Sequence, residues 1–168
     1  MKKAFILFCI LTGAFSSLFA QKATKAAFVE LGGPGLASIN YDMRLMPKND
    51  GLGFRVGIGG FSIGDKTSRS TAIFVPLGLN YLLGKDDKHF FELGAGATIV
   101  STSDKNTSSD PYNQSSNDKF STTFGHIYLG YRIQPKEGGF VFRAGITPVF
   151  GKNFFFPYLP AVSFGYAF

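Results

Sequence analysis

The two histidines of the chain, His89 and His126, are the first candidates for acid–base chemistry. His126 shares an alternating face with Tyr128, and a histidine combined with a serine and a carboxylate could carry out acyl transfer. No serine stands beside His126 at the spacing of such a motif, and the sequence contains no nucleophile elbow. His89 follows the polar turn 85–88, where a solvated side chain is expected. We therefore predict no catalytic residue and interpret His126 as a packed histidine of the core.

Three aspartates, Asp104, Asp110 and Asp118, are scattered through a segment rich in Ser, Asn and Thr. Carboxylates could hold Ca²⁺, but their spacing does not match an EF-hand loop. We expect 101–119 to be a flexible surface loop, and we predict no metal site. The single cysteine, Cys9, lies in the N-terminal segment, so no thiolate ligand or nucleophile is expected after processing. No phosphate-binding glycine loop is present, and no cofactor is predicted.

Charged and polar side chains recur at alternate positions of several apolar segments. In a β-strand such residues share one face. A charge that faces lipid costs about 2–4 kcal/mol at the bilayer midplane, so this face is expected to point into a narrow barrel. There the acids and arginines would neutralise one another in a packed interior. The predicted interior polar face consists of Glu30, Ser38, Asn40, Asp42, Arg44, Arg55, Asn80, Glu92, Tyr128, Arg132 and Arg143.

The register around two predicted turns suggests specific cross-strand neighbours. Inward residues must oppose inward residues, so Asp42 is expected to face Arg55 across the turn 47–50. The same parity around 84–87 places Asn80 opposite Glu92. Opposite charges at such positions stabilise a sheet by about 0.2–1 kcal/mol.

The elements that must position these side chains have a period of two residues. Segment 52–58 alternates Leu, Phe, Val and Ile with Gly, Arg and Gly, and segments 91–99, 127–133 and 162–168 alternate similarly. Segment 25–46 could be one bent strand, but two strands give the even number typical of bacterial barrels. The eight predicted strands are 25–32, 36–46, 51–61, 71–83, 88–100, 120–133, 140–150 and 158–168. This pattern predicts an all-β, closed, antiparallel up-and-down transmembrane barrel.

The predicted connections fall into two groups of different length. Those on the side of the termini are short and rich in Gly, Pro, Asp or Lys, namely 47–50, 84–87 and 135–139. The opposite side receives 33–35, 62–70, 101–119 and 151–157. Short periplasmic turns and longer external loops are typical of outer-membrane barrels, so both termini are expected in the periplasm.

Three prolines, Pro76, Pro148 and Pro160, fall within predicted strands. Proline cannot donate to a ladder, and a closed barrel has no edge strand. We therefore expect local bulges at these positions.

The first twenty residues have the layout of a secretory signal peptide. Lys2 and Lys3 precede an uncharged apolar run that is too short to span a bilayer, and Ala20 precedes Gln21. We predict a signal peptide at 1–20 and a barrel domain at 21–168; a retained N-terminal anchor is the alternative. Without Lys2 and Lys3, 15 basic residues remain against 11 acidic ones, a charge of +4. No basic run exceeds two residues, so nucleic acid is not an expected partner.

The chain ends on an alternating aromatic strand. Val162, Phe164, Tyr166 and the terminal Phe168 resemble the C-terminal strand that the outer-membrane assembly machinery reads. Tyr41, Tyr81, Tyr131, Phe140 and Phe150 lie near predicted strand ends, where aromatic girdles occur.

The mature chain as a whole resembles the small eight-stranded outer-membrane barrels of the OmpA and OmpX type, in particular the barrel families of Bacteroidetes. The resemblance implies fold and location, and it brings no catalytic residues. It is carried by 30–33, 38–42, 54–57, 80–84, 92–96, 130–132, 142–145 and 163–166.

The leading hypothesis is a non-enzymatic integral barrel of a Gram-negative outer membrane, with a polar interior and exposed loops in a structural or interaction role. It is expected to be a monomer whose partners are outer-membrane lipids and the assembly machinery. One alternative is a lipid-modifying enzyme with His126 as its base. Another is a secreted soluble barrel that carries a small ligand.

Overall fold

The computed structural model describes residues 24–65, 68–106 and 116–168. Within these residues no helix is long and apolar enough to span a bilayer. The strands of the wall are β1 (Lys25–Gly32), β2 (Ala37–Arg44), β3 (Gly51–Gly64), β4 (Ser68–Leu83), β5 (His89–Asn106), β6 (Ser116–Ile133), β7 (Gly139–Ile146) and β10 (Pro160–Ala167). A short hairpin of β8 (Val149–Gly151) and β9 (Phe154–Phe156) lies beside it.

The wall is a closed antiparallel ring. Each strand pairs with its neighbour in the chain from β1 to β7, β7 pairs with β10, and β10 pairs with β1. The eight-stranded barrel predicted from the alternation is therefore confirmed. Segment 25–46 forms two strands, separated by the 3-10 turn η1 (Gly33–Gly35).

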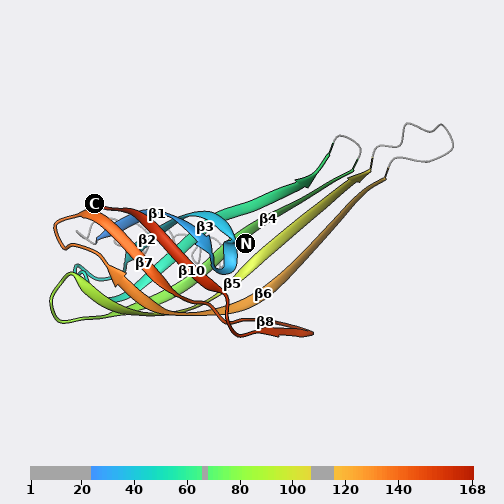
Figure 1. The fold of residues 1–168 in the computed structure, drawn as a ribbon. Helices are drawn as coiled ribbons and strands as arrows, with labels where there is room; N and C mark the ends of the chain where they lie inside the picture. Colours follow the sequence, from blue (N-terminus) through green and yellow to red (C-terminus); the bar gives the residue numbers. More distant parts are fainter. Residues whose placement is uncertain (1–23, 66–67, 107–115) are drawn as a thin grey trace, which may run out of the picture.

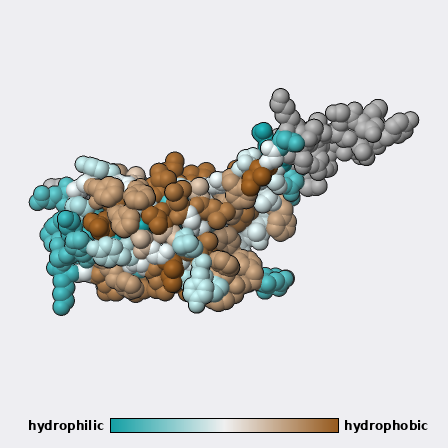
Figure 2. Space-filling model, viewed as in Figure 1, coloured by the Kyte–Doolittle hydropathy of each residue, from teal (hydrophilic) through white to brown (hydrophobic). Residues whose placement is uncertain are grey.

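The two faces of the wall have opposite polarity. Phe54, Leu93 and Phe164 point outwards with 37%, 37% and 47% of their surface exposed, whereas Arg55 and Glu92 are buried. Figure 2 shows the consequence, a hydrophobic surface over the barrel with hydrophilic side chains gathered at the end that carries the short turns. The alternation thus places apolar side chains outside and charges inside.

One end of the barrel is closed by short turns. The C-terminus lies at this end (Figure 1), and Phe168 and Lys25 exchange backbone hydrogen bonds of 2.8 and 3.0 Å. At the other end η1 folds into the barrel mouth, and its three residues are buried. Gly32, at φ 78°, begins this inward bend, and a side chain there would collide with the carbonyl of Pro160.

Four strands extend beyond the rest of the wall. β3 with β4 and β5 with β6 continue as a four-stranded sheet that projects well past the barrel (Figure 1). We call this sheet, residues 59–64, 68–74, 100–106 and 116–122, the tongue. The loops predicted at 62–70 and 101–119 are therefore wrong in large part. Their Ser-rich and Thr-rich strands lack the apolar alternation that marks a strand in the sequence, and they pair because the neighbouring strand continues beside them.

The prolines interrupt the ladders in two ways. β4 keeps its pairing with β5 at Pro76, while its pairing with β3 stops between Leu77 and Phe74. The register is the same on both sides of this gap, so the bulge predicted at Pro76 is wrong. The ladder opens there without an extra residue.

The predicted strand 140–150 is split at Thr147 and Pro148, which separate β7 from β8. On the returning chain three residues, 157–159, lie between β9 and β10. Ile146 pairs with Pro160, and Val149 pairs with Phe156. The two residues 147–148 therefore lie opposite the three residues 157–159. This extra residue is a bulge, as predicted for the region of Pro148 and Pro160.

Candidate functional site

The charged residues of the interior form one alternating chain. Asp42 lies between Arg44 at 2.6 Å and Arg132 at 3.1 Å. Glu92 lies between Arg132 at 3.6 Å and Arg143 at 2.7 Å. Glu30 lies between Arg143 at 3.0 Å and Arg55 at 2.5 Å. The sequence of charges is therefore Arg44, Asp42, Arg132, Glu92, Arg143, Glu30, Arg55.

Each carboxylate of this chain is held by two arginines because four cations alternate with three anions. Removing an ion from water costs several kcal/mol, and close opposite charges offset that cost only when the remaining polar atoms are bonded. Asn80 supplies such bonds by donating its amide to Asp42 at 2.5 Å and to Glu92 at 3.0 Å. Ser163 donates to Glu30 at 3.1 Å. The interior is thus a connected network.

Aromatic rings lie against the guanidinium groups of this network. The ring of Phe28 lies 4.5 Å from Arg143, 5.3 Å from Arg55 and 6.0 Å from Arg132. The ring of Tyr128 lies 4.5 Å from Arg143. Cations over aromatic faces are attracted by the ring quadrupole. Sequence reasoning missed Phe28 because it collected polar residues only, although Phe28 lies two residues before Glu30 and so on the same face of the strand.

The two predicted cross-strand pairs had different outcomes. Asp42 does lie directly opposite Arg55. Asn80 lies opposite Gly94, and Glu92 lies opposite Leu82, so the second pairing was wrong by two residues. The turn between β4 and β5 is wider than expected, since Asp87 has φ 56° and the Asp86 carboxylate accepts the N–H groups of Lys88 and His89.

The structure places all predicted polar residues inside the barrel. The hydroxyl of the uncharged Ser38 accepts a hydrogen bond from the side-chain amide of Asn40 at 2.9 Å. The side-chain oxygen of Asn40 in turn accepts hydrogen bonds from the Arg55 guanidinium at 2.9 and 3.0 Å. The buried set comprises Glu30, Ser38, Asn40, Asp42, Arg44, Arg55, Asn80, Glu92, Tyr128, Arg132 and Arg143.

Two further buried amides close the end with the short turns. Gln134 donates to the side-chain oxygen of Asn49 at 2.7 Å, and Asn49 donates to the backbone oxygens of Gln134 and Asp87, both at 2.8 Å. Arg132 donates to the side chain of Gln134 and so joins this pair to the charged chain. Sequence reasoning assigned Asn49 to the turn 47–50 and left Gln134 between the strand 120–133 and the turn 135–139.

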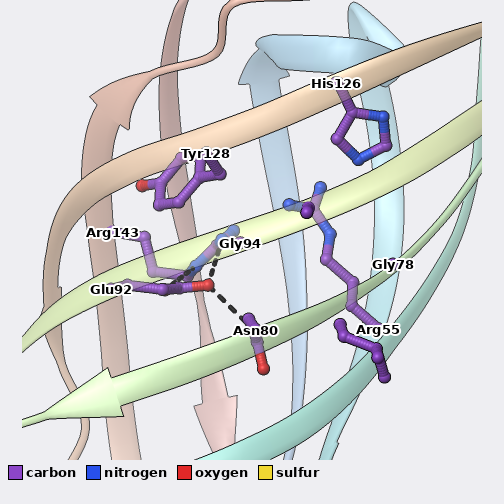
Figure 3. Close-up of a pocket in the computed structure, with 10 residues that line it drawn as sticks. Arg55, Gly78, Asn80, Glu92, Gly94, His126, Tyr128 and Arg143 are labelled. Carbon is purple, nitrogen blue, oxygen red and sulfur yellow. Dashed lines mark hydrogen bonds and ion pairs between the residues drawn. The ribbon is translucent and has the colours of Figure 1, made fainter.

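A small cavity lies within the network, between the charged chain and His126. It has a volume of about 20 Å³ and is lined by Arg55, Asn80, Glu92, His126, Tyr128 and Arg143. Figure 3 shows Arg55 extending towards His126, and Glu92 bound by Arg143 and Asn80. A cavity of this size holds about one water molecule. It is too small for a lipid or sugar substrate.

The two histidines lie in different surroundings. His126 is 6% exposed, and its Nδ1 lies 3.2 Å from the hydroxyl of Thr98. His89 lies at the exposed turn, where its ring contacts the Tyr131 hydroxyl and lies 4.0 Å from the Asp86 carboxylate. Among the residues that the structure describes, neither imidazole is placed beside a serine and a carboxylate in the manner of an acyl-transfer triad.

The aspartates considered for Ca²⁺ do not form a site in the part of the chain that the structure describes. Asp104 lies opposite Asp118 in register and accepts a hydrogen bond from Ser70, while Asp110 lies outside the described residues. No group of three His, Cys, Asp or Glu side chains is placed to hold a metal among residues 24–65, 68–106 and 116–168.

The outward face of the wall becomes more polar in the tongue. On the outward face, Ser62 and Thr71 lie opposite each other, as do Ser101 and Ser121. The inward face carries aromatic rings, with Phe61 stacked on Phe74 at 6.0 Å. Because the outward face of the barrel below is apolar, the wall changes from a lipid-compatible to a water-compatible surface at the base of the tongue.

The terminal aromatic side chains face outwards on β10. Phe164 packs against Phe142 at 5.4 Å and against Phe140 at 6.3 Å between ring centres. Tyr166 and Phe168 are exposed, and Val162 is half-buried on the same face.

Comparison with solved structures shows what this fold is similar to. The N-terminal β-barrel domain of Pseudomonas aeruginosa OprF matches with a TM-score of 0.57 and 16% identity, over 88% of this chain and 98% of that chain. Neisserial surface protein A matches with a TM-score of 0.47 and 15% identity, over 86% and 92%. Yersinia pestis Ail, solved with the heparin analogue sucrose octasulfate, matches with a TM-score of 0.46 and 12% identity, over 87% of this chain and 97% of that chain.

The first of these comparisons establishes the class of fold, the small closed barrel found in outer-membrane proteins. Comparison of the sequence with known protein families and with curated proteins finds no match.

Proposed function

We propose that this chain is a non-enzymatic integral protein of a Gram-negative outer membrane, which acts through the tongue that it presents outside the bilayer. Residues 1–20 serve as a signal peptide that is removed, and residues 21–168 form the mature barrel. The observation that carries the proposal is the inverted polarity of the wall, with charges inside and apolar side chains outside.

The inverted polarity favours lipid over water as the surroundings. Soluble proteins rarely expose large contiguous apolar patches, yet apolar side chains of all eight wall strands are exposed here. A soluble ligand-binding barrel would also need an interior pocket. The interior is instead filled by the charged chain and by Phe28, which disfavours the secreted alternative.

The orientation follows from the two ends of the barrel. Short turns in outer-membrane barrels lie in the periplasm, and longer connections lie outside the cell. Both ends of the described barrel, at Lys25 and Phe168, lie with the short turns, so we place the termini in the periplasm. Val162, Phe164, Tyr166 and Phe168 would then be available to the assembly machinery.

The tongue is the part of the molecule best placed to contact other molecules. It continues four strands past the level where the outward face becomes polar, and its inward face presents exposed aromatic side chains such as Phe61 and Phe120. A hydrogen-bonded sheet that carries apolar side chains into water is more typical of an interaction surface than of a passive loop. The barrel is its membrane anchor, and we expect a monomer.

An enzymatic role finds less support in the site. His126 is enclosed within the wall, and the cavity beside it holds about one water molecule. A lipid substrate in the membrane would have to cross the wall to reach this imidazole.

Cell fractionation combined with gel mobility tests the proposal. Without boiling, the folded barrel is expected to migrate faster than the boiled chain and to be recovered from the outer-membrane fraction. The mature protein should lack residues 1–20 when its N-terminus is sequenced. A product that is soluble without detergent, or whose mobility does not change on boiling, would refute the membrane assignment.

A further inference from the structure

The hairpin of β8 and β9 lies outside the closed wall. β8 extends the edge of β6 beyond the end of β7, pairing Val149 with His126 and Phe150 with Gly125. β9 folds back on β8 and is the last strand in the sheet order. In Figure 1 the hairpin projects from the same end as the tongue but diverges from it. It is therefore a separate element at the outer rim.

The hairpin has two distinguishable faces. Phe150 and Phe155 lie directly opposite each other and share one face. The Phe150 ring occupies the space where a side chain on Gly125 would lie, and Gly125 alternates with the inward His126, so this face points outwards. Phe150 is 43% exposed and Phe155 is 66% exposed.

The opposite face of the hairpin packs on the protein in part, since Phe154 and Phe156 on this face remain 51% and 52% exposed. Val149 is buried, and the ring of Phe154 meets that of Phe124 edge-on at 6.2 Å. Two three-residue strands are too short to be stable on their own in water. The inner face supplies part of the required packing, whereas on the outer face only Phe150 lies against the wall, over Gly125, and Phe155 is 66% exposed.

The hairpin stands at the level where the apolar wall ends. On β6 the outward face passes from Ile127 through Gly125 to Thr123, and on β5 it passes from Ile99 to Ser101. Phe150 is paired with Gly125 and so lies at this transition. Aromatic side chains are enriched at this depth of a membrane, where an apolar ring meets polar headgroups.

We propose that the outer aromatic pair, Phe150 and Phe155, inserts into the outer leaflet, so that the hairpin anchors the rim of the barrel to lipid. The inference rests on the proposed membrane function. Lipid is the occupant because the pair continues the lipid-facing surface of the barrel upwards. The polar turn of the hairpin, Lys152 and Asn153, then reaches the headgroups, where a cation is attracted to lipid phosphate.

The absence of tryptophan from the sequence allows a direct test. Single-tryptophan variants Phe155→Trp and Phe150→Trp report on the hairpin, Phe54→Trp reports on the barrel wall, and Ser121→Trp reports on the polar face of the tongue. Each full-length mature protein is folded into phosphatidylcholine vesicles whose acyl chains are brominated either near the headgroup or deep in the bilayer. The mobility shift on boiling confirms that each variant has folded.

The hairpin reporters are expected to lose most of their fluorescence with shallow bromines and less with deep ones. Phe54→Trp should be quenched as well, while Ser121→Trp should keep its fluorescence and emit at longer wavelength. If both hairpin reporters are unquenched while Phe54→Trp is quenched, the anchor is refuted and the membrane function stands. Unquenched hairpin reporters with short-wavelength emission would show a protein cover and would equally refute the anchor. If Phe54→Trp is also unquenched, the proposed membrane function itself fails.

Discussion

Asp42 and Arg55 lie directly opposite each other on β2 and β3, yet each forms its ion pairs elsewhere. Asp42 binds Arg44 on its own strand and Arg132 across the barrel, while Arg55 binds Glu30 two strands away. Long arginine side chains reach diagonally through the interior, so a cross-strand neighbour is only one of several available partners. The stability of the barrel should therefore depend on the whole alternating chain.

Arg143 is one of the two cations of that chain that bind two carboxylates, and its removal should be costly. Arg143→Met leaves Glu92 and Glu30 each with one arginine fewer in a buried setting, so we expect a loss of about 3–5 kcal/mol in unfolding free energy. The matched control is Lys136→Met, which removes an exposed pair with Asp87 and should cost about 0–1 kcal/mol. Urea unfolding in vesicles, followed by gel mobility, measures both. Equal losses would contradict the prediction.

Phe28 should contribute to stability in the interior, although it is not polar. Phe28→Ala removes the ring that three guanidinium groups contact and leaves a cavity, so a loss of about 3–5 kcal/mol is expected. Val29→Ala, on the neighbouring lipid-facing position, serves as the control and should cost much less. Urea unfolding in vesicles, followed by gel mobility, measures both variants. A nearly unchanged urea midpoint for Phe28→Ala would show that the ring is dispensable for stability.

The hydroxyl of Tyr128 offers a test in the opposite direction. It is buried against Gly130 and Gly145 and has no hydrogen-bond partner among the described residues. Tyr128→Phe keeps the ring beside Arg143 and removes a polar atom whose burial costs about 1–3 kcal/mol, so the variant should be as stable as the parent or more stable. A clear loss of stability on urea unfolding would reveal a bonding partner for the hydroxyl.

His126→Ala separates the structural interpretation from the enzymatic one. Because the imidazole is enclosed, lipid A and phospholipid profiles measured by mass spectrometry should match those of cells that carry the parent protein. Loss of the contact with Thr98 should lower the unfolding free energy by about 1 kcal/mol. A changed lipid profile in cells that make equal amounts of folded variant would restore the enzyme hypothesis.

Asp86 should make the turn before β5 sensitive to acid. The backbone N–H of His89, and then that of Lys88, bind the carboxylate and lower the pKa of Asp86 below its usual value. A carboxyl group whose pKa is lower in the folded than in the unfolded protein stabilises the folded state when the pH is above the unfolded pKa. This contribution is lost as the pH falls through the folded pKa. Asp86→Ala should therefore be less stable than the parent at neutral pH, and the difference should vanish at acid pH. A difference that persists at low pH would contradict this origin.

Much of the wall could be predicted from the sequence, because alternation is a local property. Each strand that faces lipid on one side and charge on the other must alternate, so strands such as 25–32 were placed correctly from residue types alone. The outer ends of the tongue strands were missed, since their Ser-rich and Thr-rich sequence resembles a loop. Pairing with the neighbouring strand is what makes them regular.

The amino-acid sequence by itself determined that charges gather on one face of the wall and aromatic and aliphatic residues on the other. Only the tertiary structure decided which charge meets which, since Asp42 and Arg132 are 90 residues apart and become neighbours when the ring closes. It also decided that Phe28 belongs with the arginines and that β8 and β9 leave the wall. These relations depend on the closure and register of the whole barrel, which no single segment specifies.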